Sequence, residues 1–185
     1  MPSAKNTCKT AYINKISHEI EALVSHGVYV RGNASSSILL IKGQLNEAEL
    51  AGGLLLDGED GKALRAALGA LGYPPEDGAY LSAQLADHTS SLPAELLVEA
   101  ITVLSPLTVV LLDDAAADVF REAYAADLAL CENFDEALLT PGLVVYVAGL
   151  RVLALGQFEH GLAESATKQK MWAWLKQIPP LSDPF

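Results

Sequence analysis

The chain has 185 residues, of which 51% are hydrophobic, and it carries a formal net charge of −11. That length is typical of one domain with a sizeable core, and we expect residues 1–185 to form it, with 1–12 as a candidate flexible N-terminus. Because nucleic-acid affinity comes mainly from Lys and Arg that neutralise phosphates, the acidic balance disfavours a general nucleic-acid binder.

In the first half of the chain, segments of helical and strand type alternate. Apolar residues at helical spacing predict an amphipathic helix over 12–28. Four consecutive large aliphatics at 38–41 are typical of a strand that is buried on both faces. An Ala- and Leu-rich helix is predicted over 62–71, ending at Gly72, and a second strand over 79–82.

The second half continues the alternation. Pro93 predicts the start of a helix over 93–104, and the wholly apolar segment 107–112 predicts a third strand. Asp113-Asp114 then caps a helix over 115–124. The last predicted elements are a hairpin of strands 143–147 and 151–155 and a closing helix over 165–177. This pattern predicts an α/β fold, a three-layer αβα sandwich with a mainly parallel central sheet.

A long loop over 42–60, rich in Gly and acidic residues, follows the first predicted strand. Ligands of open α/β sheets bind outside the carboxyl ends of the parallel strands. We therefore expect this loop to form one wall of any small-molecule or base pocket.

Cofactor and membrane signals are missing from the sequence. The two cysteines, Cys8 and Cys131, cannot supply a four-cysteine zinc or iron–sulfur site, and the four histidines show no helical metal-ligand spacing, so we expect neither a cofactor nor a metal. The N-terminal residues lack an apolar signal core, and the most apolar segment, 143–158, is broken by Gly149 and Arg151. These features predict a cytoplasmic protein that does not enter a membrane.

Several segments occur in the order and spacing of a known family. They are the lead-in Val30-Arg31-Gly32-Asn33, the Gly-rich loop 53–61, the strand Tyr80-Leu81-Ser82-Ala83, the lead Ser105-Pro106 into 107–112, and the closing helix 166–176. Together they resemble the uracil-DNA glycosylase superfamily, closest to its iron–sulfur-containing branch, over residues 13–178. The resemblance implies a uracil-DNA glycosylase-like fold.

The family's residues for base excision are replaced in this chain. The resemblance implies a candidate pocket at six motif positions: Gln44, Asn46, Leu56, Ala83, Gln157 and Glu159. Leu56 holds the place of a stacking Phe but has no π face, and Ala83 holds the place of a base-reading Asn but has no hydrogen-bonding group. Gln157 replaces a His that stabilises the leaving base, and Glu159 adds negative charge beside it.

These replacements weigh against catalysis and lead to two classes of hypothesis. The first is a divergent, non-catalytic uracil-DNA glycosylase-like protein that acts as a binding or structural module for an unknown ligand. The alternative is a DNA glycosylase of altered base specificity that uses Gln44, Asn46 or Gln157, or a small-molecule nucleobase binder. A pocket that is open and neutral would favour the enzyme, and one filled by Leu56 and Phe158 and lined by acids would favour the first. The sequence identifies no partner; the fold would permit nucleic acid, which the net charge disfavours.

Overall fold

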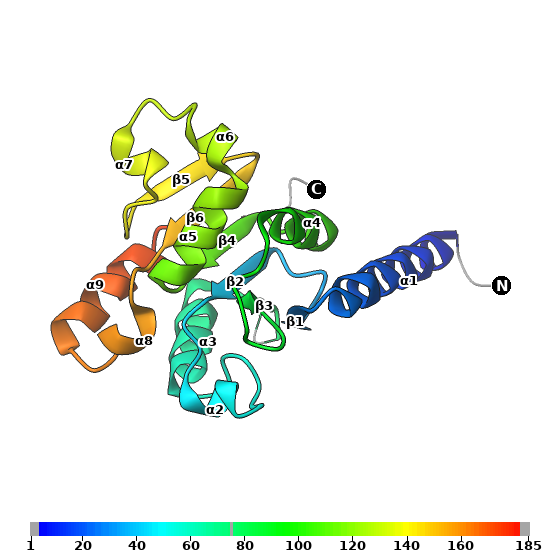
Figure 1. Cartoon of the computed structure of the whole chain (residues 1–185), viewed down its shortest axis with the longest axis horizontal. Helices are drawn as coiled ribbons and strands as arrows, with labels where there is room; N and C mark the ends of the chain where they lie inside the picture. The colour runs from blue at the N-terminus through cyan, green and yellow to red at the C-terminus, as the bar shows by residue number, and fades with distance from the viewer. Residues whose placement is uncertain (1–3, 75, 182–185) are drawn as a thin grey trace.

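The computed structural model describes the backbone of residues 4–74 and 76–181 and the side chains from residue 15 onward (Figure 1). Its centre is a six-stranded sheet in the order β1-β3-β2-β4-β6-β5. The strands are β1 Val28–Gly32, β2 Ile38–Lys42, β3 Ala79–Leu85, β4 Thr108–Leu111, β5 Val144–Val147 and β6 Leu150–Ala154. The four inner strands are parallel to one another, and the edge strands β1 and β5 are antiparallel to their neighbours.

The strand order reverses at β2, which lies between the strands that follow it in sequence. Leu40 of β2 pairs with Tyr80 of β3 on one side and with Val110 of β4 on the other. The chain therefore leaves β2 toward β3 and later crosses back to β4. In open parallel sheets, such a reversal leaves a crevice outside the carboxyl ends of the two diverging strands.

Helices lie against both faces of the sheet because alternate residues of each strand point to opposite sides. Leu39 and Ile41 belong to a buried cluster with residues of α1, α4 and α5, whereas Ile38 and Leu40 belong to a second cluster with residues of α3 and α9. The helices are α1 Ala4–Ser25, α2 Glu47–Leu50, α3 Glu59–Leu71, α4 Ala94–Leu104, α5 Asp114–Ala123, α6 Ala125–Leu128, α7 Phe134–Ala137, α8 Phe158–Gly161 and α9 Ser165–Leu175.

The predicted α/β class and the parallel pairing of 38–41, 79–82 and 107–112 are confirmed. The predicted hairpin is also present, with β5 antiparallel to β6. The first helix differs, because α1 begins at Ala4 and ends at Ser25 instead of spanning 12–28. Gly27 has a φ of 84°, a left-handed conformation that lets the chain turn from α1 into β1, a strand that the sequence analysis did not predict.

The loop after β2 also departs from the prediction. It contains the short helix α2, and α3 begins at Glu59 rather than at residue 62. Glu59 and Asp60 in the first turn of α3 suit the positive end of the helix dipole. The predicted stop is confirmed, since Gly72 ends α3 with a φ of 100°.

Membrane-spanning helices require both length and high hydropathy. Within the described ranges, none of the helices combines the two.

Candidate functional site

A cavity of about 420 Å³ lies at the carboxyl ends of β2 and β4, beside the point where the strand order reverses. The loop between β2 and α3 forms one wall, as the sequence predicted, and Gln157 with the first residues of α8 forms another part of the lining. The lining residues are Lys42, Gln44, Leu45, Asn46, Glu47, Leu50, Asp60, Leu112, Asp113, Gln157, Phe158, Glu159 and His160.

Lys42, the last residue of β2, is the centre of the site. Its side chain is only 3% exposed, and its ammonium contacts three carboxylates. Nζ lies 2.6 Å from Asp60 Oδ2, 2.8 Å from Glu49 Oε2 and 2.8 Å from Glu159 Oε2. Because an ammonium has three donors, all of them are used within the protein. The cluster thus joins β2 to α2, α3 and α8.

These contacts fix the charge on Lys42. Burial by itself lowers the pKa of this amine, but the hydrogen bonds to Asp60, Glu159 and Glu49 outweigh burial and raise the pKa above its ordinary value of 10.5. Lys42 is therefore protonated at neutral pH. A lysine that acts as a nucleophile or a general base needs a neutral amine, so this arrangement does not support either role for Lys42.

Glu49 is held in place by the start of α2. Asn46 Oδ1 accepts from the Glu49 N–H at 3.0 Å, and Glu49 Oε2 accepts from the Asn46 N–H at 2.9 Å, which is a reciprocal capping box. Glu49 Oε1 also accepts from the Leu56 N–H at 2.7 Å. One buried carboxylate therefore organises both ends of the loop and still contacts Lys42.

Asp113 ties the end of β2 to the start of α5. Its Oδ2 accepts from the N–H groups of Gly43 at 2.8 Å and Gln44 at 2.9 Å. Its Oδ1 accepts from the Ala116 N–H at 2.8 Å, which confirms the predicted helix cap. A Cβ at Gly43 would lie 2.7 Å from Ala116 N, so this close approach requires glycine.

The carboxylates around Lys42 differ in exposure. The side chains of Asp60 and Glu49 are 2% and 4% exposed, whereas that of Glu159 is 39% exposed. Asp60 Oδ1 has no hydrogen-bond partner among the described residues. The cluster therefore has at least one carboxylate oxygen that accepts no hydrogen bond from the described residues. Glu159 is the carboxylate of the cluster that is most exposed to solvent.

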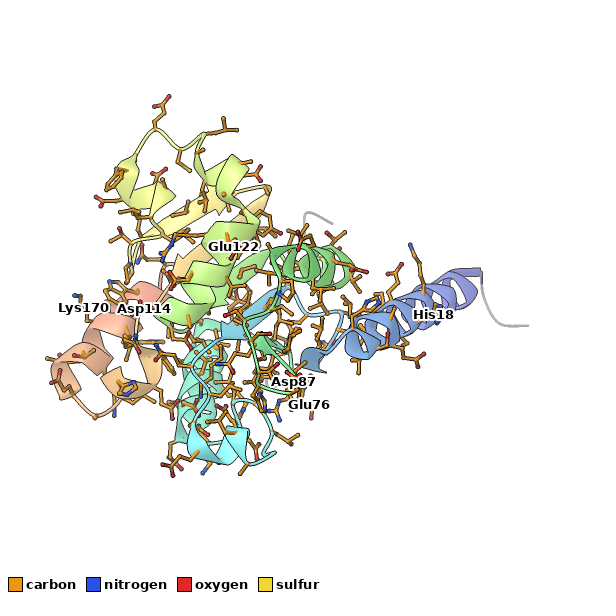
Figure 2. All side chains as sticks on the ribbon, viewed as in Figure 1. His18, Glu76, Asp87, Asp114, Glu122 and Lys170 are labelled. Atoms are coloured by element: carbon orange, nitrogen blue, oxygen red, sulfur yellow. The ribbon has the colours of Figure 1, made fainter. Side chains whose placement is uncertain are left out.

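Four of the six positions suggested by the family resemblance border this cavity: Gln44, Asn46, Gln157 and Glu159. Asn46 Nδ2 donates to Glu159 Oε1 at 3.2 Å, so two of them are in contact. Gln157 donates to Asp114, which lies in the first turn of α5 and is labelled in Figure 2.

The other two positions lie away from the cavity. Leu56 is fully buried in the apolar cluster of α3 and α9, and Ala83 is 1% exposed in the cluster on the opposite face of the sheet. Neither side chain borders the space that Gln157 and Glu159 enclose.

Sequence reasoning missed the ion cluster itself. The position of Lys42 directly after four buried aliphatics was a signal. If the strand extends by one more residue, the lysine side chain is buried too and needs acidic partners. The spacing of Asn46 and Glu49 was also typical of a capping box. Asp60 gave no such signal. None of the described residues forms a group of three or more His, Cys, Asp or Glu side chains suited to a metal ion.

The cavity has an acidic lining with an apolar side. Glu47, Asp60, Asp113 and Glu159 contribute carboxylates, and Lys42 contributes the one ammonium among the described lining residues. Leu45, Leu50, Leu112 and Phe158 contribute apolar surface. Because every donor of Lys42 is used, this balance disfavours anions and favours ligands that carry positive charge or donate hydrogen bonds.

Comparison with protein-family models and with curated proteins finds no match to this chain.

Proposed function

We propose that this protein is a divergent, non-catalytic member of the uracil-DNA glycosylase-like superfamily that binds a small molecule in the cavity beside Lys42. The order of its parallel strands and the helices on both faces support the fold that the sequence resemblance implies. The position of the cavity at the carboxyl ends of the strands supports a ligand site there.

The observation that carries this proposal is that three carboxylates of the protein surround the Lys42 ammonium. Glu49, Asp60 and Glu159 take all three donors of the ammonium, so the polar surface offered to a ligand consists mainly of acceptors. A ligand that fits has an amino or ammonium group for the acidic side and a flat or compact apolar part for Phe158 and its neighbours. A nucleobase with an exocyclic amine and a small organic amine both meet this description, and a phosphate group does not.

The positions that would stack and read a base support the non-catalytic assignment. Leu56 and Ala83 lie in the core, where a flipped base cannot reach them. Gln157 already donates to Asp114, which leaves its amide less available for stabilising a leaving base.

The proposal is tested by ligand-observed NMR with four probes: adenine, cytosine, agmatine and thymidine monophosphate. We expect saturation transfer to one or more of the three amine-bearing probes and none to the phosphate. The Gln157→Trp variant should abolish the transfer, because a tryptophan at this half-buried lining position fills the cavity.

The matched control is Gln169→Trp, which places the same side chain on the exposed surface of α9 and should leave binding unchanged. Amine binding that survives Gln157→Trp would show that the Lys42 cavity is not the site. Preferential binding of the phosphate probe would contradict the inferred preference of this cavity for amines.

A DNA glycosylase of altered base specificity is the second candidate. One observation favours it: the side chain of Gln44 lines the cavity, is exposed, and has no hydrogen-bond partner within the described part of the chain. Its amide can therefore meet a base edge. Release of a free base from oligonucleotides that carry modified bases, lost in a Gln44→Ala variant, would favour this candidate over the binding module.

A further inference from the structure

The outer edge of β5 is open. Tyr146 lies opposite Arg151 of β6, and the Arg151 N–H donates at 3.0 Å to Leu107 O on the far side of β6. Tyr146 and Arg151 are therefore a pair that exchanges no backbone hydrogen bonds, and the same holds two residues away at Val144. The N–H and C=O groups of Val144 and Tyr146 point outward from the sheet, and no described residue pairs with them.

A groove of about 560 Å³ runs beside this edge, between the hairpin and the segment that holds α6 and α7. Figure 1 shows these two short helices next to β5 at the end of the sheet. Tyr146 and Leu130 line the groove, and they are 74% and 82% exposed. Large apolar side chains with such exposure beside an unpaired strand are features of strand-addition sites and of edges prone to association.

The rim of the groove is acidic. Asp127, Glu132 and Glu136 line it, and the described lining residues include no Lys or Arg. A second copy of this chain is a poor occupant, because two-fold pairing of the β5 edges would bring the acids of both copies together. A segment with alternating apolar and basic residues matches the exposed Tyr146 side chain on one face of β5 and the acids of the α6–α7 segment on the other.

We propose that the β5 edge binds an extended, basic segment of a partner protein, which adds to the sheet as a seventh strand beside β5. Backbone hydrogen bonds to Val144 and Tyr146 supply the pairing. The apolar side chains of the segment lie on the Tyr146 face of β5, and its basic side chains lie on the opposite face, where α6 and α7 present Glu132 and Glu136. This site lies at the opposite end of the sheet order from β1 and does not involve the Lys42 cavity, so it is independent of the proposed function.

The test uses two short acetylated peptides, one of alternating Lys and Val and one of alternating Glu and Val, with NMR of the full chain as the readout. We expect the Lys peptide to bind about tenfold or more tightly than the Glu peptide, and its binding to weaken as salt is added. The amide hydrogens of Val144 and Tyr146 should become protected from exchange when it binds.

Two variants test the contacts. Glu132→Lys combined with Glu136→Lys should weaken binding of the Lys peptide about tenfold, whereas Glu95→Lys combined with Glu99→Lys, on the exposed face of α4, should not. Tyr146→Pro removes an outward N–H without removing a bond to β6, and it should also weaken binding.

Three results would overturn the proposal. One is equal binding of the two peptides or binding of neither. Another is protection that falls outside β5. The third is a dimer of the chain alone, seen by sedimentation, in which Val144 and Tyr146 are already protected, because the occupant would then be a second copy.

Discussion

Lys42 is a single residue on which the whole site depends. Its side chain is almost fully buried, and its ammonium neutralises part of a cluster that also contains Glu49 and Asp60. A buried ion pair adds little net stability compared with an apolar pair, but removing one partner leaves an uncompensated buried charge. Replacing Lys42 alone should therefore lower the free energy of unfolding much more than replacing Lys42 and Asp60 together.

We expect Lys42→Met to lower the free energy of unfolding by about 3–5 kcal/mol, because Glu49 and Asp60 lose their counter-ion. Adding Asp60→Asn removes one of the stranded charges and should recover part of the loss. Denaturant titration of the three proteins measures both effects. A single variant as stable as the wild type would mean that the carboxylates do not depend on Lys42.

The stability at high pH should also depend on this residue. The pKa of Lys42 is higher in the folded protein than its ordinary value of 10.5, so its contribution is complete below that pH and is lost as the pH rises through the folded pKa. Burial raises the pKa values of the Tyr73 and Tyr124 phenols, which acts in the same direction. Above pH 10.5 the stability of the wild type should therefore fall more steeply than that of Lys42→Met with Asp60→Asn. The double variant lacks the Lys42 contribution but keeps those of the tyrosines and of Lys62, whose pKa is raised by its hydrogen bond to Glu59. Denaturant titrations on either side of that pH decide the point, and parallel slopes would contradict it.

Elements of this fold were predictable from sequence where local signals agreed. β2 was predictable from its unbroken aliphatic run, and α3 and α5 from boundary residues, the Gly72 stop and the Asp113 cap, next to helical patterns. β1 was missed because its Val28 continues the apolar spacing of α1 across Gly27. The one-turn helix α2 was missed because it is too short for periodicity to show.

Asp113 connects two of these elements, and its removal should affect both. We expect Asp113→Ala to lower the free energy of unfolding by about 2–4 kcal/mol, because α5 loses its cap and the N–H groups of Gly43 and Gln44 lose their acceptor. The control is Asp87→Ala, which removes an exposed carboxylate that bonds only within its own turn and should have a much smaller effect. Thermal and denaturant unfolding measure the difference, and equal losses would show that the link between β2 and α5 adds nothing.

A substitution in the turn between β5 and β6 should stabilise the protein. Ala148 and Gly149 have φ values of 49° and 79°, the mirror-image turn that two-residue hairpins prefer, and a left-handed conformation is costly for alanine. Ala148→Asn should therefore raise the free energy of unfolding by about 0.5–1 kcal/mol, since asparagine tolerates this conformation. The same change at Ala66, exposed in the middle of α3, should lower stability by about 0.5 kcal/mol. A loss of stability at both positions would mean that the turn imposes another constraint.

At the scale of the whole molecule, the site is formed by residues that are far apart in the sequence. Lys42 meets Asp60 across 18 positions and Glu159 across 117 positions of sequence, and no local pattern signals that these three side chains converge. Sequence reasoning could place the cavity at the carboxyl ends of the strands and name part of its lining. It could not find the ion cluster, because that depends on how α8 and α3 pack around the end of β2.

The whole-molecule properties also bear on DNA repair chemistry, and we expect no excision of uracil from single- or double-stranded DNA. The net charge of −11 and the carboxylates of the cavity oppose the approach of a phosphate backbone. Leu56 and Ala83, which the family resemblance aligns with a stacking and a base-reading residue, are buried in the core. Gln157, which the family resemblance aligns with a stabilising histidine, is neutral and donates to Asp114. Base flipping, base recognition and stabilisation of the leaving base would each need a different residue to take over the missing role.

A gel assay with uracil-containing oligonucleotides at low salt, which favours weak DNA binding, measures this activity. The matched variants are Gln157→Ala in the cavity and Gln169→Ala on the exposed surface of α9. Strand cleavage after alkali that matches a protein-free control is the expected result for all three proteins. Turnover by the wild type and by Gln169→Ala that disappears in Gln157→Ala would contradict the non-catalytic proposal, because a contaminating glycosylase would not respond to a substitution in this cavity.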